Sequence, residues 1–361
     1  MGGQYRTRPR GRIPTGVGAG LQNRNGVAFG GFGGFDSHTL PPVGHRERPP
    51  LLSTPHDSDS FPSVVTTLLL VNPVAGHGRA RHLAAAAQDA LAGAFGEVRV
   101  VESPAPGAAV QIVQDSVGQG VERVMVLGGD GTVHEAANGL LRGPRANRPP
   151  LGVIPAGTGN DFAKLCGTAR LSPGGAVQCL ARGSVRHLDV GQGWGEFFLN
   201  SIGIGFDAEV ADRLTRLKHG RGLPAYLVTT LRTLASRATF EVRVEADTHS
   251  FEDCLLLLEI GNGPVVGGGF RITPGAQPDD GLLDICAIQD MPLPLLLLRL
   301  PLVMLGRHLH LPQVRHFRTS RLRVVSPSGA LRAQFDGEIR TSHEPLDVQV
   351  VPSALPVLCA S

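Results

Sequence analysis

One stretch limits the choice of fold more than any other. The glycine turn Gly128–Thr132, with the sequence Gly-Gly-Asp-Gly-Thr, directly follows the short apolar run 124–127, which is typical of a buried parallel strand. Apolar side chains then recur at helical spacing, at Val133, Ala136, Ala137 and Leu140. A strand, a glycine turn and a helix predict an α/β fold, and they place the turn where open sheets bind ligands.

The residues of this turn suit a phosphate group. Glycine lets backbone amides approach an anion, and the free amides of the next helix add partial positive charge. Asp130 would repel phosphates unless a cation lies between them, so the turn indicates Mg²⁺ bound with a nucleotide. Thr132 can bind phosphate through its hydroxyl, and Glu135 suits the helix dipole or the metal shell. Taken alone, the motif also fits an ordinary strand–helix connection.

Length and composition exclude several classes of protein. The 361 residues have room for two domains, and a net charge of +3 is too small for a nucleic-acid-binding polycation. The five cysteines are odd in number, widely spaced and without a Cys-x-x-Cys pair, which argues against disulfides and zinc and favours a reducing, cytoplasmic setting. The leucine-rich stretch 293–305 contains Pro294, Arg299 and Pro301 and is too short to span a membrane.

Residues 1–62 differ from the rest of the chain. They are rich in Gly, Pro and Arg, contain no acidic residue before Asp36, and show no periodicity, which predicts a disordered tail. The early arginines come without an apolar segment, so a secretory signal is not expected. A transit peptide, a start codon set too far upstream and a weak electrostatic membrane tether are the alternatives for this tail.

Residues 63–183 are predicted to form a nucleotide-binding α/β domain. Two more strand–turn–helix units are expected, with strands at 64–71 and 151–155, turns at 72–78 and 156–160, and helices at 79–94 and from 161. A further strand at 98–101 and helix at 107–117 lie between them. Strands alternating with helices imply a parallel sheet, so three glycine turns are expected to converge on one ligand.

Residues 184–352 are predicted to form a mainly antiparallel β-sandwich. Strands are expected at 197–200, 240–245, 255–260, 283–288, 322–325 and 346–350, with helices at 207–217 and 292–307. The last residues, 353–361, are expected to return to the first domain. The active site should then lie in the cleft between the two domains.

Five stretches, in this order, resemble the diacylglycerol kinase catalytic-domain family, particularly its soluble bacterial lipid kinases. They are Asn72–Gly76, Gly128–Thr132, Pro155–Ala163, Gly261–Asp284 and Phe335–Glu338. The resemblance extends from Leu68 to the C-terminus, although NAD kinases and phosphofructokinases also carry something similar to the Gly-Gly-Asp-Gly-Thr turn. It implies an α/β domain like that of NAD kinase and phosphofructokinase, followed by a β-sandwich, with ATP and Mg²⁺ between them.

The resemblance also implies nucleotide contacts. They would fall on Asn72, Pro73, Val74, Ala75, Gly76, Ser103, Gly129, Asp130, Gly131, Thr132, Val133, His134, Glu135 and Thr158. Ser103 stands where the family often has threonine and keeps the hydroxyl. His134 stands where asparagine is usual, and a histidine could make this contact pH-sensitive near neutrality.

For the chemistry, the resemblance implies that Glu338 is the catalytic base, with Asp336 sharing or supporting this role and Asp130 anchoring the metal–nucleotide unit. A carboxylate can accept the proton that an acceptor hydroxyl loses late in phosphoryl transfer. From the residues alone, an exposed acid on a hairpin is the alternative for Glu338.

A structural Mg²⁺ site is also implied by the resemblance, with the backbone carbonyls of Gln277 and Leu282 and the carboxylate of Asp280 as ligands. The acid-rich stretch 279–284 fits a polar turn before a strand equally well. Asn160-Asp161 is expected to cap the next helix or to contact the ligand.

The expected function is that of a cytoplasmic lipid kinase that docks transiently on membranes and converts diacylglycerol to phosphatidic acid. A sphingoid base, phosphatidylglycerol and NAD are alternative acceptors, and a non-catalytic nucleotide- or lipid-binding regulator is the alternative class. The expected partner is a membrane lipid, and homodimerisation is left open. The leucines at 295–300 are expected in the core, with a membrane-facing lip as the alternative.

Overall fold

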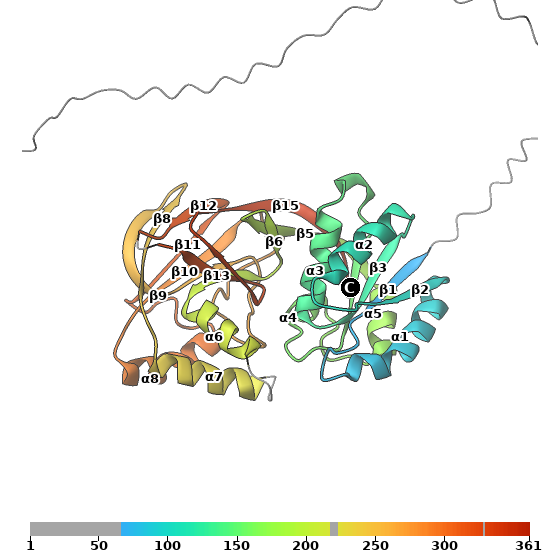
Figure 1. The fold of residues 1–361 in the computed structure, drawn as a ribbon, viewed down its shortest axis with the longest axis horizontal. Coiled ribbons are helices and arrows are strands. Elements are labelled where there is room, and N and C mark those ends of the chain that lie inside the picture. The colour runs from blue at the N-terminus through green and yellow to red at the C-terminus, as the bar shows by residue number, and fades with distance from the viewer. Residues whose placement is uncertain (1–65, 217–222, 328) are drawn as a thin grey trace, which may run out of the picture. The chain divides into compact units, whose positions relative to one another are not determined.

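The computed structural model describes residues 66–216, 223–327 and 329–361, so the predicted tail 1–62 lies outside the described residues. The first part alternates strands and helices as predicted (Figure 1). Its elements are β1 Thr67–Val71, α1 Arg79–Phe95, β2 Val98–Glu102, α2 Ala108–Gly118, β3 Arg123–Gly128, α3 Asp130–Leu141, η1 Arg145–Asn147, β4 Leu151–Pro155, α4 Asp161–Leu165 and α5 Pro173–Arg182.

The four strands form a parallel sheet in the order β2-β1-β3-β4. Successive side chains of β1 point to opposite faces: Leu68 and Leu70 pack in a core with α2 and α3, whereas Leu69 and Val71 pack in a core with α1 and α5. All four side chains are fully buried. Helices cover both faces, which explains why these strands are continuous apolar runs.

The second part is built almost entirely of strands. They are β5 Ser184–Gly193, β6 Glu196–Phe198, β7 Ser201–Gly205, β8 Phe240–Ala246, β9 Ser250–Gly261, β10 Leu283–Gln289, β11 Val314–Thr319, β12 Arg321–Val325, β13 Leu331–Phe335, β14 Glu338–Ser342 and β15 Leu346–Cys359. The helices are α6 Phe206–Thr215, α7 Leu223–Ala235 and α8 Leu293–Met304. All pairings among these strands are antiparallel, which confirms the predicted mainly antiparallel domain.

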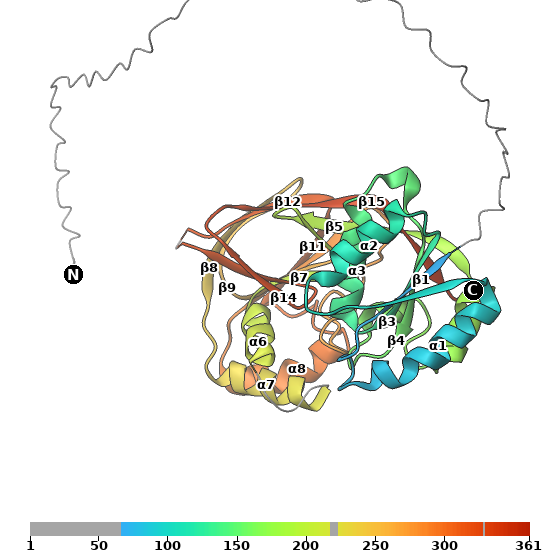
Figure 2. The same cartoon turned by 45° about the vertical axis from the view of Figure 1, so that its right-hand side comes forward.

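This second part has two cores, one on each face of its strands. Val242 and Val244 of β8 lie in the core of the sandwich, so the alternation predicted at 240–244 is confirmed. The other core lies between the sheet and the helices, with Leu257 of β9 and Leu296 of α8 among its members. The helices α6, α7 and α8 therefore cover one face of the strands (Figure 2).

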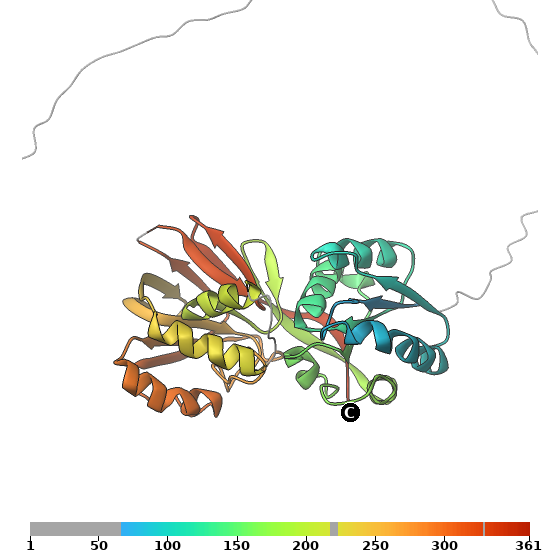
Figure 3. The ribbon, with the colours of Figure 1, turned by 60° about the horizontal axis from the view of Figure 1, so that its bottom comes forward.

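Two long strands, β5 and β15, connect the two parts of the described chain. They pair with each other along most of their length, and β15 also pairs with β12. Near its end, β15 reaches the parallel sheet, where Val357 pairs with Leu151 of β4. Figure 3 shows both strands running between the sandwich and the α/β part. One hydrogen-bonded path of strands thus passes through both.

Helix α7 has no counterpart among the predicted elements. Its run Val228-Thr229-Thr230 is β-branched, which lowers helix propensity, and its threonines are buried while its valine is exposed. Leu227 and Leu234 face inward, but the threonines between them break the apolar stripe that would reveal the helix in the sequence. Among the described helices, none combines the length and the apolarity needed to cross a bilayer.

Candidate active site

The three glycine turns meet at the carboxyl ends of β1, β3 and β4, as predicted. A Cβ on Gly76 would lie 2.1 Å from the carbonyl oxygen of Ala156, and one on Gly157 would lie 2.5 Å from the Cα of Gly129. No side chain fits at these two positions, so glycine is required for the turns to pack against each other. The backbone amides of all three turns are thereby gathered in one place.

Asn72 joins the first turn to the second. Its side-chain amide donates to the hydroxyl oxygen of Thr132 at 2.9 Å, and its Oδ1 accepts from the amide of Val74 at 3.2 Å. The Thr132 hydroxyl is buried and keeps its own proton available for an oxygen of a ligand. Direct nucleotide contacts of Asn72–Gly76 and Thr132 stay predictions, but these residues lie together.

Asp130 holds the second turn to the third. Its Oδ1 accepts from the amide of Phe162 at 3.1 Å, at the start of α4, and its Oδ2 would lie 2.8 Å from a Cβ on Gly159. Burial and the charge of Asp161 raise the pKa of Asp130 to about 6. A buried, repelled carboxylate is the setting in which a bound cation is stabilising, so Asp130 fits the implied Mg²⁺.

The predicted cap of α4 is wrong in its details. Asn160 precedes α4, but its side chain donates to the carbonyl of Gly157 at 3.0 Å and caps no described amide of the helix. Asp130 takes that role instead. Asp161, the other predicted cap, has its Oδ2 accept from the amide of Gly268 at 2.8 Å and so ties α4 to the sandwich.

A two-residue hairpin turn, Asp336-Gly337, joins β13 to β14, and Glu338 is the first residue of β14. Asp336 and Gly337 both have positive φ, 47° and 98°, the conformation that Asp-Gly favours in such turns. The side chain of Glu338 is 52% exposed, and its Oε1 would lie 3.9 Å from a Cβ on Gly131. The hairpin therefore presents the solvated carboxylate of Glu338 beside the glycine turn Gly128–Thr132.

Asp336 has a different environment from Glu338, because its carboxylate is buried and both of its oxygens accept hydrogen bonds. It accepts from the backbone amides of Leu199, Asn200 and Ser201 at 2.7, 2.8 and 3.1 Å, and it contacts His134 Nδ1 at 2.9 Å. These four interactions occupy the lone pairs that a base would need. The geometry favours support of the hairpin, rather than a shared base, as the role of Asp336.

His134 lies between two carboxylates and is almost fully buried. Its Nδ1 contacts Asp336, and its Nε2 contacts Glu196 Oε1 at 3.0 Å. Burial lowers the pKa of His134, but the hydrogen bonds to the two carboxylates outweigh it and raise the pKa to about 9. Both ring nitrogens are occupied, so a nucleotide contact here would have to use the backbone, and titration near neutrality is not expected.

This histidine predicts a pH dependence of stability. The folded pKa of about 9 exceeds the ordinary value of 6.5, so the folded state binds the proton more tightly. The stabilisation, on the order of 3 kcal/mol at about 1.4 kcal/mol per unit, is complete below pH 6.5 and is lost as the pH rises to about 9. Urea unfolding across this window should show the decline in the wild type and not in His134→Asn. An equal decline in both would contradict the assignment.

The remaining predicted nucleotide residues occupy varied environments. Glu135 Oε2 accepts from the amide of Ala109 at 3.1 Å at the start of α2, and the Ser103 hydroxyl donates to the carbonyl of Ala105 at 3.1 Å. Val133 is buried in the core, whereas Thr158 is exposed at its turn. A side-chain contact of Val133 with a nucleotide is therefore not supported, and only its backbone amide is suitable.

A polar cavity of about 530 Å³ brings several of these residues together. Its lining includes His134, Glu135 and Glu338, along with Gly107 at the start of α2 and Arg340 of β14. The volume is within the range of ligand sites in proteins. The cavity thus lies between α3, the helix of the glycine turn Gly128–Thr132, and the hairpin that carries Glu338.

The predicted structural Mg²⁺ site lies at the turn before β10. The carboxylate of Asp280 pairs there with the guanidinium of Arg318 and accepts from the amide of Leu282 at 3.0 Å. A metal ion at this turn would share the carboxylate with the arginine. The ligand set Gln277, Asp280 and Leu282 stays a prediction.

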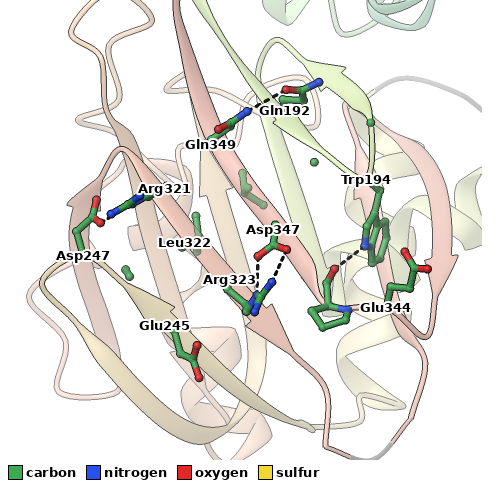
Figure 4. Close-up of a pocket in the computed structure, with 15 residues that line it drawn as sticks. Gln192, Trp194, Glu245, Asp247, Arg321, Leu322, Arg323, Glu344, Asp347 and Gln349 are labelled. Carbon is green, nitrogen blue, oxygen red and sulfur yellow. Dashed lines mark hydrogen bonds and ion pairs between the residues drawn. The ribbon is translucent and has the colours of Figure 1, made fainter.

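A second, open groove lies over the outer strands of the sandwich and holds none of the predicted site residues. Figure 4 shows that each of its two arginines faces an aspartate. Arg323 binds both carboxylate oxygens of Asp347, Arg321 pairs with Asp247, and the indole of Trp194 donates to a backbone carbonyl. These mutual pairings stabilise the sheet surface and leave little for a ligand.

Comparison with known proteins agrees with this geometry. The model of the diacylglycerol kinase catalytic domain matches residues 66–193, and that of the YegS C-terminal NAD kinase beta sandwich-like domain matches residues 200–359. A diacylglycerol kinase of Mycobacterium tuberculosis is 33% identical over 302 residues, which cover 80% of this chain and 93% of that protein. A YegS-like candidate lipid kinase of Pseudomonas aeruginosa is 37% identical over 189 residues, 51% of this chain and 61% of that protein.

A solved structure shows the same fold. It is that of a candidate diacylglycerol kinase from Bacillus anthracis, with a TM-score of 0.68 and 26% identity, and the match covers 82% of this chain and 97% of that one. Both the α/β domain and the sandwich are therefore shared with relatives. The chain belongs to the diacylglycerol kinase catalytic-domain family of lipid kinases.

Proposed function

We propose that this chain transfers the γ-phosphoryl group of ATP to the hydroxyl of a lipid, with diacylglycerol as the first candidate. The observation that carries the proposal is a cavity with mostly apolar walls. The one acidic residue among the described residues of its lining, Asp207, is connected by hydrogen bonds to the hairpin turn that precedes Glu338. The relative from M. tuberculosis, which is named a diacylglycerol kinase and aligns with most of the chain, supports the choice of acceptor.

The cavity lies between the sheet and the helices α7 and α8. Its walls are almost entirely apolar and include Leu257 of β9, Ile288 of β10 and Leu296 of α8. The hydroxyl of Thr230 also lines it and has no hydrogen-bond partner among the described residues. An unpaired buried hydroxyl in an apolar cavity suits a ligand that brings its own oxygen, such as an ester. At about 80 Å³, the cavity must widen to admit an acyl chain.

A chain of hydrogen bonds leads from this cavity to the turn beside the proposed base. Asp207 lines the cavity, and its Oδ2 accepts from the side-chain amide of Gln334 at 2.7 Å. The Oε1 of Gln334 accepts in turn from the amide of Gly337 at 2.5 Å. A headgroup near Asp207 would therefore lie close to the turn that presents Glu338, the residue proposed to take the proton of the acceptor hydroxyl.

The phosphate side is assigned to the three glycine turns. Their backbone amides would hold the phosphates of ATP, while Asp130 would hold Mg²⁺. The metal ion, when bound, neutralises charge on the transferring phosphoryl group. Asp130 would also keep α4 in place through the amide of Phe162. Positioning and charge neutralisation are the main requirements of this reaction.

A sphingoid base is a second candidate acceptor, favoured by one observation. Glu259 of β9 is fully buried, and its cross-strand neighbour Gly203 is covered by the carboxylate of Asp207, which would lie 2.3 Å from a Cβ there. Burial and the charge of Asp207 raise the pKa of Glu259 well above its usual range. Neither carboxyl oxygen of Glu259 has a hydrogen-bond partner among the described residues, and the amine of a sphingoid base would supply one.

The direct test is the transfer of labelled γ-phosphate from ATP–Mg²⁺ to diacylglycerol, a sphingoid base, phosphatidylglycerol and NAD, with Asp130→Asn as the blank. Label on diacylglycerol that disappears in the blank is expected. A preference for the sphingoid base would favour the second candidate. Label on NAD alone would contradict a lipid acceptor, and no label despite ATP binding would favour a regulator.

Filling the cavity is expected to weaken acceptor binding selectively. Ile288→Phe should raise the KM for the lipid by at least about tenfold, because the added ring occupies the space of an acyl chain, while ATP binding stays unchanged. Ile260→Phe on the neighbouring β9 overpacks the opposite core and is the matched control for lost stability. Equal KM values for the two variants would exclude this cavity as the acceptor site.

A further inference from the structure

Helix α7 buries three hydroxyls on its inner face, beside Leu227 and Leu234, and exposes two aliphatic side chains on its outer face. Thr229, Thr230 and Thr233 face inward and are almost fully buried. Val228 and Leu231 face outward, with exposed fractions of 46% and 40%. A surface helix normally buries its aliphatic side chains and exposes its hydroxyls, since apolar surface in water is unfavourable. The outer face of α7 is therefore suited to a medium other than water.

The neighbouring helix α8 shows the same pattern more strongly. Leu297, Leu298 and Leu305 are 44%, 74% and 61% exposed, whereas Leu296 is buried. These three leucines, with the exposed Pro294 and Pro301, recur at helical spacing and form one outward stripe. The leucines at 295–300, predicted as core, are thus divided between the inner and the outer side of the helix.

The two stripes lie on adjacent helices. Helices α7 and α8 contact each other and run side by side in Figures 1 and 3. We call the five exposed aliphatic side chains Val228, Leu231, Leu297, Leu298 and Leu305 the α7–α8 face. Several large apolar side chains exposed on two packed helices indicate an interaction surface rather than scattered surface residues.

The charge around the α7–α8 face selects the kind of partner. The sequence has no aspartate or glutamate between residues 213 and 240, nor between 291 and 319, although it has several arginines in both stretches. Arg232 of α7 and Arg307 just after α8 are exposed and form no ion pair with any described residue. An apolar face with free cations and no acids matches an anionic lipid bilayer.

We propose that the α7–α8 face docks on the surface of an anionic lipid bilayer. The inference rests on the proposed lipid acceptor, because the same two helices line the acceptor cavity through Thr230, Leu234, Leu300 and Val303. Docking places the outer side chains among the lipids and the inner ones around the cavity. An acceptor then passes from the bilayer to the cavity without crossing water, where each apolar chain would be exposed.

Vesicle flotation of the full chain tests the docking directly. Vesicles of phosphatidylcholine with phosphatidylglycerol should carry the wild type, and vesicles of phosphatidylcholine alone should carry at least about tenfold less. The double variant Leu298→Glu/Leu305→Glu should lose binding by a similar factor, because two carboxylates cannot enter the bilayer and are repelled by it. Leu171→Glu, which changes an exposed leucine of the α/β domain, should bind as the wild type does.

The outcomes separate docking from the kinase reaction. The double variant should keep full activity on a short-chain acceptor dissolved in water and lose it only on acceptor in vesicles. Wild-type binding by the double variant, or equal binding to both vesicle types, would overturn the proposal. So would sedimentation showing that the double variant merely converts a dimer to a monomer, since a second copy would then cover the face. Docking without phosphorylation of any acceptor would leave the surface assigned and overturn the function.

Discussion

Glu338→Gln is expected to lower kcat by about 100- to 10,000-fold while leaving the Kd for ATP–Mg²⁺ nearly unchanged. The amide keeps the size and hydrogen-bonding ability of the side chain but cannot accept the proton of the acceptor hydroxyl. Folding should be unaffected, because the Glu338 carboxylate is half exposed and its nearest charged partner, Arg340 Nη1, is 4.0 Å away. Single-turnover phosphoryl transfer and ATP titration measure the two quantities separately.

The control for this variant is Glu344→Gln, which changes another exposed glutamate just after β14. It should retain wild-type turnover, since Glu344 is not in the cavity that Glu338 lines. Comparable turnover in Glu338→Gln and the wild type would exclude Glu338 as the base. A loss of turnover in both glutamine variants would show that the negative charge of this surface matters, and not proton acceptance by Glu338.

Asp130→Asn is expected to lower kcat/KM by about 100-fold or more and, at neutral pH, to raise the free energy of unfolding. The amide can still accept from the Phe162 amide and so keep α4 in place. The charge, however, is unfavourable in the free protein, because burial and Asp161 raise the pKa of Asp130 from 3.8 to about 6. Its removal should stabilise the fold by on the order of 1–3 kcal/mol.

The sign of this effect follows from proton linkage. A carboxyl whose pKa is raised on folding binds its proton more tightly in the folded state, so the cost appears as the pH rises from 3.8 to about 6 and is complete above that value. Urea unfolding above pH 6, with and without ATP–Mg²⁺, measures it. The ligand should stabilise the wild type more than the variant. A less stable Asp130→Asn at neutral pH would show that the charge serves α4 rather than a cation. Asp115→Asn, on the exposed side of α2, is the neutral control.

The local sequence was sufficient to predict the elements of the α/β domain and the residues of its turns. The apolar runs at β1, β3 and β4 are buried on both faces. Strands that are apolar along their whole length can be recognised without knowing which elements pack against them. Gly76 and Gly157 are predicted turn residues because they stand between a strand pattern and a helix pattern, and the close approach of the turns explains why glycine is required there. In the same way, Asp-Gly at 336–337 marks a hairpin.

The environment of each carboxylate was decided only by tertiary structure. Asp336 and His134 are 202 residues apart, and the contact between them removes one predicted base and one predicted nucleotide contact from solvent. For the same reason, Asp130 and not Asn160 accepts from an amide of α4, because the fold brings Asp130 from another turn to the start of this helix.

Helix α7 shows the limit of pattern recognition most clearly. Its buried face mixes three threonines with Leu227 and Leu234, and Val228 and Leu231 face outward. A rule that places apolar residues inside therefore found no clear pattern. The sequence by itself determined which segments form strands, turns and helices wherever burial follows the local period. Which charges are paired, which carboxylate stays free and which apolar face stays exposed depended on contacts between segments distant in the chain, whose energies no local pattern contains.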